Sequence, residues 1–185
     1  MGRDTRMRMI DATIASLRRH GLAGTSFTDV LEHSGAARGA IYHHFPSGKA
    51  GMVRDALVRF GGEVTARIEA LDGHSVHEVA SNFFALVRPV VLESVEGAGC
   101  PVAAITTEVD TGVALAAAAR TVFEAWTGSL QERLEVAGAG RDEARALSET
   151  LIIALEGSHV LCRALATITP FNSVATSILA SIPSG

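Results

Sequence analysis

The sequence has few aromatic residues, a single lysine, two cysteines and no long apolar run. Aromatic residues make up 5% of its 185 residues, and Lys49 is the single lysine. No apolar run approaches the roughly 18 residues that a membrane-spanning helix needs, and the charged N-terminus lacks the apolar core of a signal peptide. The two cysteines, Cys100 and Cys162, lie far apart in the chain, which favours free thiols over a disulfide in a reducing compartment. We therefore expect a soluble cytoplasmic protein.

The residues that are present favour a helical fold. Hydrophobic residues make up 48% of the chain and charged residues 19%, which is enough for a sizeable core. Apolar residues recur at helical spacing almost everywhere, alanine is abundant, and strand-like alternation is missing. The sequence predicts an all-α protein of about nine helices, over about residues 3–20, 26–34, 38–44, 48–71, 75–96, 102–109, 112–137, 141–166 and 171–182.

Charge is distributed unevenly along the chain. Through Phe60 there are nine Arg and Lys against five Asp and Glu, whereas the remainder has seven Arg against fifteen acidic residues. A basic N-terminal third on an acidic body indicates a local contact with a polyanion. Charge alone is also compatible with chance variation.

The stretch "SGAARGAIYHHFPSGK", residues 34–49, has three possible interpretations. A metal site is disfavoured because His43 and His44 point about 100° apart on a helix, and the pair His74 and His77 has no evident third ligand. A phosphate loop is disfavoured because "PSGK" lacks the first glycine of that motif and follows no strand. No Ser/His/Asp or Cys/His arrangement stands out, so we expect no catalytic residue, no metal and no cofactor.

The third interpretation is a helix-turn-helix, in which two short helices are joined by a small-residue turn. The spacing puts one set of residues inside and leaves another outside. The inner set is Val30, Leu31, Ala36, Ile41 and Phe45, and the outer set is Arg38, Gly39, Ala40, Tyr42, His43 and Lys49. The second helix has a narrow leading end because Gly39 and Ala40 are small, so it can enter a major groove closely. The alternative is a helical hairpin whose polar face is solvated.

The segment "GLAGTSFTDVLEHSGAARGAIYHHFPSGKAGMVRDAL" resembles the signature region of the TetR family of transcriptional regulators over about residues 5–57. The resemblance implies that Tyr42 and Lys49 hold DNA phosphates, and that His44 packs within the motif. It also implies that the groove is faced by Thr28, Arg38, Gly39, Ala40 and His43. Ala37 departs from the family's usual Ser or Thr, so the recognition helix lacks its usual cap. The extra Gly48, together with "GCPVAAI", is similar to the branch around the lincomycin-resistance repressor.

The family implies that the rest of the chain is a helical ligand-binding and dimerising domain. We expect a DNA-binding domain over residues 1–48 and the ligand-binding domain over residues 49–185. The helix over 141–166 is apolar on two sides, which indicates either burial within the chain or a contact with a second subunit. The candidate residues for a homodimer interface are Leu147, Leu151, Ala154, Gly157, Ser158, Leu161 and Leu165.

A pocket in this domain would bind a hydrophobic small-molecule effector. The candidate residues are Phe83, Phe84, Val87, Phe123, Trp126 and His159, each of which is also a plausible core residue. Trp126 and His159 stand out because each carries a polar atom that can orient a ligand in an apolar site.

These observations favour a ligand-responsive, homodimeric regulator, expected to be a repressor that a hydrophobic effector releases from a palindromic double-stranded DNA operator. The alternatives are a helical adaptor that binds protein instead of DNA, and a small α-helical enzyme. The charge distribution and the placement of Tyr42 and Lys49 favour the regulator over the adaptor.

Overall fold

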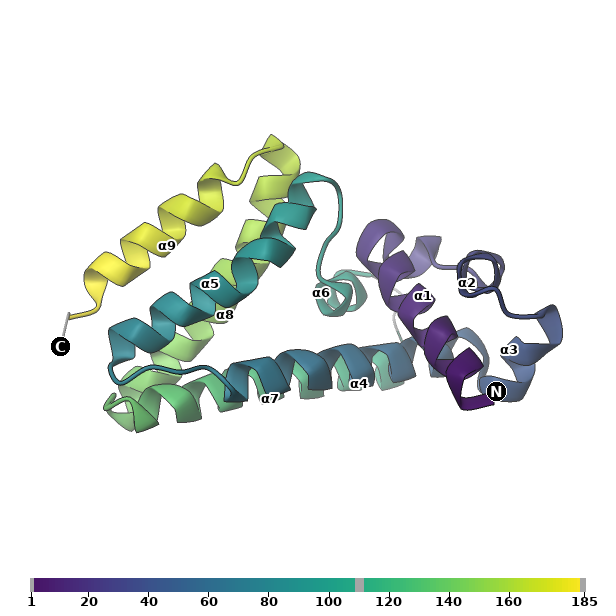
Figure 1. The fold of residues 1–185 in the computed structure, drawn as a ribbon, viewed down its shortest axis with the longest axis horizontal. Coiled ribbons are helices and arrows are strands. Elements are labelled where there is room, and N and C mark those ends of the chain that lie inside the picture. Colours follow the sequence, from purple (N-terminus) through teal and green to yellow (C-terminus); the bar gives the residue numbers. More distant parts are fainter. Residues whose placement is uncertain (1, 109–111, 184–185) are drawn as a thin grey trace. The chain divides into compact units, whose positions relative to one another are not determined.

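Nine helices and no strand occur in residues 2–108 and 112–183, the part of the chain that the computed structural model describes (Figure 1). The helices are α1 (Gly2–Gly24), α2 (Phe27–Ser34), α3 (Arg38–His44), α4 (Gly48–Glu69), α5 (Val76–Val95), α6 (Pro101–Thr106), α7 (Val113–Val136), α8 (Arg141–Leu165) and α9 (Thr169–Ser181). The predicted all-α class is confirmed, and the bounds agree with expectation to within a few residues. None of the described helices is long and apolar enough to cross a bilayer.

The chain packs into two compact units. Unit 1 comprises Met1–Gly62 and Cys100–Val122, and unit 2 comprises Glu63–Gly99 and Phe123–Gly185. The helices α1, α2, α3 and α6 belong to unit 1, α5, α8 and α9 belong to unit 2, and α4 and α7 each contribute to both. Because each unit takes in two separate stretches of sequence, this packing does not test the expected division into residues 1–48 and 49–185, which stays a prediction.

In unit 1, α1 packs against α2 and α6. Met9, Ile10 and Leu17 of α1 are at most 2% exposed, because the apolar residues of this helix recur at helical spacing on one face. Gly21 has φ 68° and ψ −172°, a left-handed conformation that glycine adopts at little cost. The regular helix is therefore interrupted one residue after the expected end at residue 20, and a short turn continues to Gly24.

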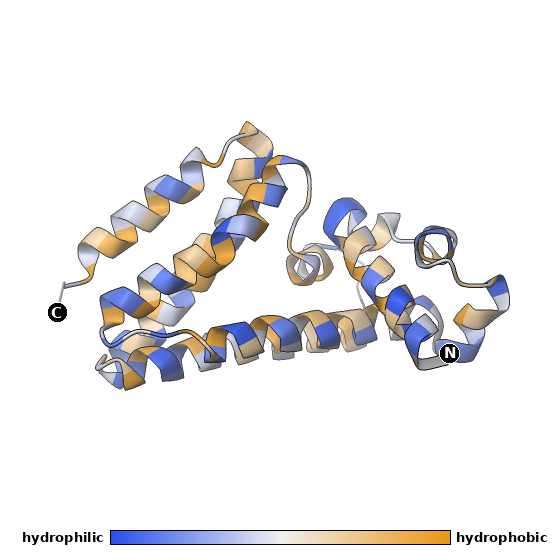
Figure 2. Cartoon of the chain, in the orientation of Figure 1, coloured by the Kyte–Doolittle hydropathy of each residue, from blue (hydrophilic) through white to orange (hydrophobic). Residues whose placement is uncertain are grey.

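In unit 2, α5, α8 and α9 pack against one another. Hydrophobic residues run along α5 and α8 (Figure 2). The rings of Phe84 and Phe171 join α5 to α9 with centroids 5.8 Å apart. Trp126 and Leu130 of α7 are at most 1% exposed. Burial of large apolar side chains therefore holds this unit together.

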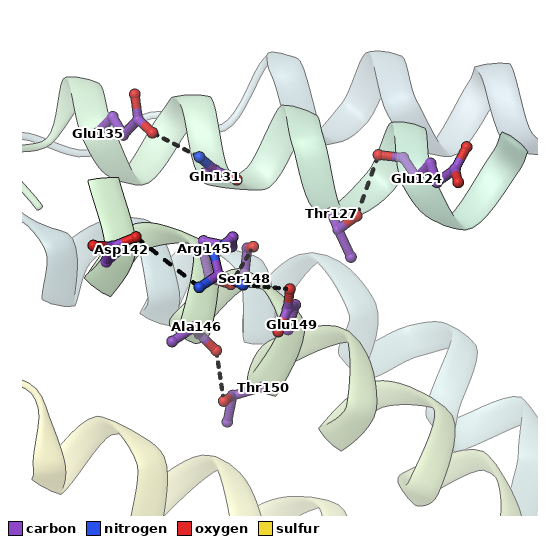
Figure 3. Close-up of polar contacts among 10 residues, drawn as sticks. All are labelled: Glu124, Thr127, Gln131, Glu135, Asp142, Arg145, Ala146, Ser148, Glu149 and Thr150. Atoms are coloured by element: carbon purple, nitrogen blue, oxygen red, sulfur yellow. Dashed lines mark hydrogen bonds and ion pairs between the residues drawn. The ribbon is translucent and has the colours of Figure 1, made fainter. Parts of the chain in front are cut away.

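Polar side chains of α7 and α8 make contacts along their own helices (Figure 3). Gln131 Nε2 donates to Glu135 Oε1 at 2.7 Å. Arg145 lies 4.0 Å from Asp142 and 3.7 Å from Glu149. These partners are three or four residues apart, so the contacts stabilise single helices and not the packing between them.

Candidate nucleic-acid interface

The predicted helix-turn-helix is formed by α2 and α3 of unit 1. Ser26 caps α2, since its Oγ accepts from the Asp29 N–H at 3.2 Å, and its hydroxyl also donates to the Asp29 carboxylate at 2.6 Å. The helix ends at Gly35, which has φ 64°. As the sequence predicts, α3 begins without a side-chain cap, because Ala37 has no hydrogen-bonding group.

A few apolar residues anchor α3. Ile41 and Phe45 are each 2% exposed, and Val30 of α2 is fully buried. Leu31 and Ala36, which were expected on the same inner face, are only half-buried. The orientation of α3 therefore depends mainly on Ile41 and on Phe45, which directly follows the helix.

The opposite side of α3 is open. Arg38, Gly39 and His43 are exposed, Tyr42 is 70% exposed, and Ala40 is half-buried. Thr28 of α2 is exposed as well. We call the exposed set Arg38, Gly39, Tyr42 and His43 the α3 surface.

Tyr42 is exposed but held in place. Its ring meets Phe27, the first residue of α2, edge to face with centroids 6.0 Å apart. His43 and His44 contact each other through their rings at 5.0 Å, and His44 is half-buried. Within residues 2–108 and 112–183, no group of three His, Cys, Asp or Glu side chains could hold a metal ion.

Gly39 has no packing partner that would require a glycine. A Cβ built at this position meets nothing within 4 Å, and its φ is not in the left-handed region. Glycine in a helix is less favourable than alanine by up to about 1 kcal/mol. The chain therefore carries a residue that weakens α3 at a point where nothing within unit 1 needs it.

Lys49 differs from the other candidate DNA contacts. It is half-buried at the start of α4, and its Nζ donates to the backbone carbonyl of Leu22 at 2.6 Å. The only ammonium side chain of the molecule is thus engaged at the C-terminal end of α1.

The structure also shows charged contacts between α1 and α4 that sequence reasoning missed. Arg6 pairs with Asp55 at 2.7 Å and stands 5.5 Å from the centre of the Phe45 ring. Arg59 pairs with Asp11 at 3.2 Å. These partners are 48 or 49 residues apart, and no local spacing signal links them.

The candidate pocket residues are mostly buried in unit 2. Phe83, Phe84, Val87, Trp126 and His159 are at most 8% exposed. Phe123 is half-buried and meets Trp126 edge to face at 5.4 Å.

His159 has a partner that sequence reasoning did not identify. Its Nδ1 lies 2.6 Å from Ser94 Oγ, and Ser94 is fully buried. The two groups are 65 residues apart in the chain. They form a buried polar pair that joins α5 to α8.

The candidate dimer residues of α8 divide into buried and exposed members. Leu151 and Ser158 are buried, Leu147 and Ala154 are half-buried, and Gly157, Leu161 and Leu165 are exposed. The exposed face also contains Ile153 at 71% and Val160 at 67%, which were missed. Their spacing from Gly157, four residues before it and three after it, is a helical signal that was available in the sequence.

Two family models match most of the chain. The model for bacterial regulatory proteins of the tetR family matches residues 9–56, and the model for the C-terminal domain of LmrA/YxaF-like transcriptional regulators matches residues 77–177. The first match contains α2 and α3. The second agrees with the branch expected from Gly48 and "GCPVAAI".

Individual relatives agree with these matches. An uncharacterized HTH-type transcriptional regulator of Mycobacterium tuberculosis, Rv0196, is 31% identical over 175 residues, which cover 91% of this chain and 89% of the relative. The crystal structure of a TetR-family regulator from Agrobacterium tumefaciens superposes with a TM-score of 0.85 at 18% identity over 100% of both chains. The TetR-family regulator CifR, as a cysteine mutant in complex with 26-bp operator DNA, has a TM-score of 0.74 at 18% identity over 96% of both chains. This chain therefore belongs to the TetR family of DNA-binding transcriptional regulators, in the branch with an LmrA/YxaF-like C-terminal domain.

Proposed function

We propose that the α3 surface enters the major groove of operator DNA and that its binding represses transcription. Arg38 is exposed at the first turn of α3, where its guanidinium can donate to a guanine edge or a phosphate. The Tyr42 hydroxyl can donate to a phosphate while Phe27 holds its ring. Thr28 and His43 extend the same contact, and Ala40 lets the backbone approach closely.

The observation that carries this proposal is Gly39. Its exposed position and empty surroundings are explained if the missing side chain makes room for DNA and not for another part of the protein. We expect Gly39→Ala to raise the free energy of unfolding by up to about 1 kcal/mol, while the affinity for operator falls because the added methyl group stands between α3 and the groove.

The experiment uses a duplex that the wild-type protein selects from random-sequence DNA. Fluorescence anisotropy measures binding, and urea denaturation measures stability, for wild type, Gly39→Ala and Gly128→Ala. Gly128 of α7 is a matched control, since a Cβ there also meets nothing within 4 Å. Tighter DNA binding by Gly39→Ala would contradict the proposal. A wild-type affinity that does not fall with added salt would favour the protein-binding adaptor, because phosphate contacts release counterions.

We further propose that the protein binds a palindromic operator as a homodimer through α8. The exposed apolar residues Ile153, Val160, Leu161 and Leu165 form a face that water would otherwise cover, and Gly157 lets a second helix approach closely. Two copies of α3 would then contact half-sites about 34–36 Å apart. If the protein sediments as a monomer at micromolar concentration in analytical ultracentrifugation, this arrangement is wrong.

The effector we propose is a hydrophobic small molecule bound in unit 2. The candidate lining is Phe83, Phe84, Val87, Phe123, Trp126 and His159, and the Ser94–His159 pair would orient a polar group of the ligand. Because α4 is one continuous helix with residues in both units, a ligand that shifts it would change DNA affinity. Unchanged operator affinity at saturating effector would overturn the coupling. The proposed site of action is the cytoplasm, and the proposal assigns no catalytic role.

A further inference from the structure

The turn after Gly21, which we call the α1–α2 turn (residues 21–24), is held by side chains from two other segments of unit 1. Lys49 Nζ of α4 donates to the Leu22 carbonyl at 2.6 Å. Glu108, two residues beyond the end of α6, accepts from the Ala23 N–H through its Oε1 at 3.2 Å. The Lys49 ammonium and the Glu108 carboxylate therefore form hydrogen bonds with the backbone of two adjacent residues.

The chemistry of this turn suits both charges. Carbonyls at the C-terminal end of a helix carry partial negative charge, which favours a nearby ammonium. A backbone N–H donates a stronger hydrogen bond to a carboxylate than to a neutral acceptor. Both contacts therefore hold backbone atoms that directly follow the break at Gly21.

The α1–α2 turn also determines where the helix-turn-helix begins. The Thr25 hydroxyl donates to the Gly21 carbonyl at 2.7 Å, and the Thr25 N–H donates to the Leu22 carbonyl at 3.3 Å. Thr25 is 1% exposed and directly precedes Ser26, the cap of α2. A displacement of the turn would therefore be passed on to the start of α2 and, through Gly35, to α3.

The α1–α2 turn and Glu108 fall in the matches to two different family models. The turn lies within the match to the tetR-family model, residues 9–56, whereas Glu108 lies within the match to the LmrA/YxaF-like C-terminal model, residues 77–177. A residue of the C-terminal match therefore forms a hydrogen bond inside the DNA-binding match, and both belong to unit 1.

We propose that Lys49 and Glu108 are positioning residues for DNA binding, which act by holding the α1–α2 turn and thereby the placement of α3. The proposal rests on the proposed DNA-binding role of the α3 surface. Lys49 then contributes to affinity through Leu22 and not mainly through a phosphate, and Glu108 contributes although its charge has the same sign as DNA.

A positioning role and direct electrostatics predict different results, in the salt dependence of binding for Lys49 and in the direction of the affinity change for Glu108. If Lys49 acted as a phosphate contact, its removal would lower the salt dependence of binding by about 0.9 in the slope of log K against log salt concentration. If Glu108 acted only by its charge, its removal would tighten binding. A positioning role predicts weaker binding in both cases and an unchanged slope.

The test measures the affinity for the duplex that wild-type protein selects, at several salt concentrations, for Lys49→Met, Lys49→Arg, Glu108→Ala and Glu108→Gln. Affinity is referred to folded protein, whose fraction is determined by circular dichroism at the temperature of the assay. Arg19→Gln and Glu32→Gln are the charge-matched controls, since both residues are exposed on helices of unit 1.

We expect Lys49→Met and Glu108→Ala to weaken binding about tenfold with an unchanged salt slope, and Lys49→Arg and Glu108→Gln to weaken it less. Glu32→Gln should leave binding unchanged or tighten it. Glu108→Ala and Glu108→Gln binding as tightly as wild type, or Lys49→Met lowering the slope by about 0.9, would overturn the proposal. Where a larger change prevents folding, Lys49→Arg and Glu108→Gln decide. If wild type selects no duplex, the proposed DNA-binding function fails, and not only the positioning role.

Discussion

Unit 1 and unit 2 are both helical and both bury large apolar side chains, but they differ in how far apart in the sequence their charged partners lie. In unit 1, charged groups join segments that are far apart in sequence: Arg6 with Asp55, Arg59 with Asp11, and Lys49 with the Leu22 carbonyl. In unit 2, large apolar side chains such as Phe83, Trp126 and Leu130 are at most 1% exposed. The ion pairs described on α8, around Arg145, join near neighbours of one helix (Figure 3).

The difference follows from what each unit presents to the outside. α3 is anchored chiefly through Ile41 and Phe45, because its other face is left open. Apolar burial is non-directional, whereas a charged hydrogen bond requires a particular geometry. The directional contacts of α1 and α4 therefore supply a precision of placement that the small core around α3 does not supply alone.

The largest expected effect is in the core of unit 2. Trp126→Ala removes a side chain that is 1% exposed, and should lower the free energy of unfolding by about 3–5 kcal/mol. Urea denaturation measures this loss. Val136→Ala on the same helix is the control, because Val136 is 74% exposed and should change stability by less than about 0.5 kcal/mol. A loss below about 1 kcal/mol at Trp126 would show that burial does not dominate in unit 2.

A smaller effect is expected where α4 meets α7 in unit 1. A Cβ at Gly61 would lie 2.6 Å from Cγ2 of Val122, whereas a Cβ at Gly62 would meet nothing within 4 Å. Since valine is stiff in a helix, Gly61→Ala should destabilise the protein by about 1–3 kcal/mol. Gly62→Ala should stabilise it by up to about 1 kcal/mol.

Both glycines lie in α4 and both are changed to alanine. The difference in stability between the two variants therefore reports the contact with Val122. Thermal unfolding of both variants measures the difference. Equal melting temperatures for Gly61→Ala and Gly62→Ala would mean that α4 and α7 do not approach closely at this point. A second substitution, Val122→Ala, should recover part of the stability lost in Gly61→Ala.

The smallest effects test the ion pairs directly. A double-mutant cycle with Arg6→Gln and Asp55→Asn should give a coupling of about 0.5–1 kcal/mol, because the pair is partly exposed. The same cycle on Arg145 and Glu149 should give about 0.2–0.5 kcal/mol. Repeating both cycles in 1 M salt should shrink the more exposed α8 pair further. A larger coupling on α8 than between α1 and α4 would reverse the comparison of the two units.

Local signals predicted the helix-turn-helix well. Ser26 and Gly35 cap the two ends of α2, and α3 runs over Arg38–His44 as expected. The outward placement of Arg38, Tyr42 and His43 follows from helical periodicity. The assignment of these residues to DNA contacts, like that of the pocket and dimer residues, stays a prediction.

Non-local partners were not predictable in the same way. The sequence indicates that Lys49 carries a charge near α3, but not that its ammonium binds the Leu22 carbonyl. It places His159 on an apolar helix, but not beside Ser94. On α8, the two-sided apolar pattern did not tell which residues face α5 and α9 and which, like Ile153 and Val160, are exposed.

The sequence by itself determined the helical class, the positions of the helix ends and the family, because caps, glycines and periodicity act over a few residues and are written in order along the chain. The tertiary structure alone decided which charges meet, that α6 joins the unit of α1, and that Glu108 binds the turn before α2. The physical reason is that these contacts form between chain segments that only packing brings together. A contact between residues tens of positions apart produces no periodic pattern in the sequence.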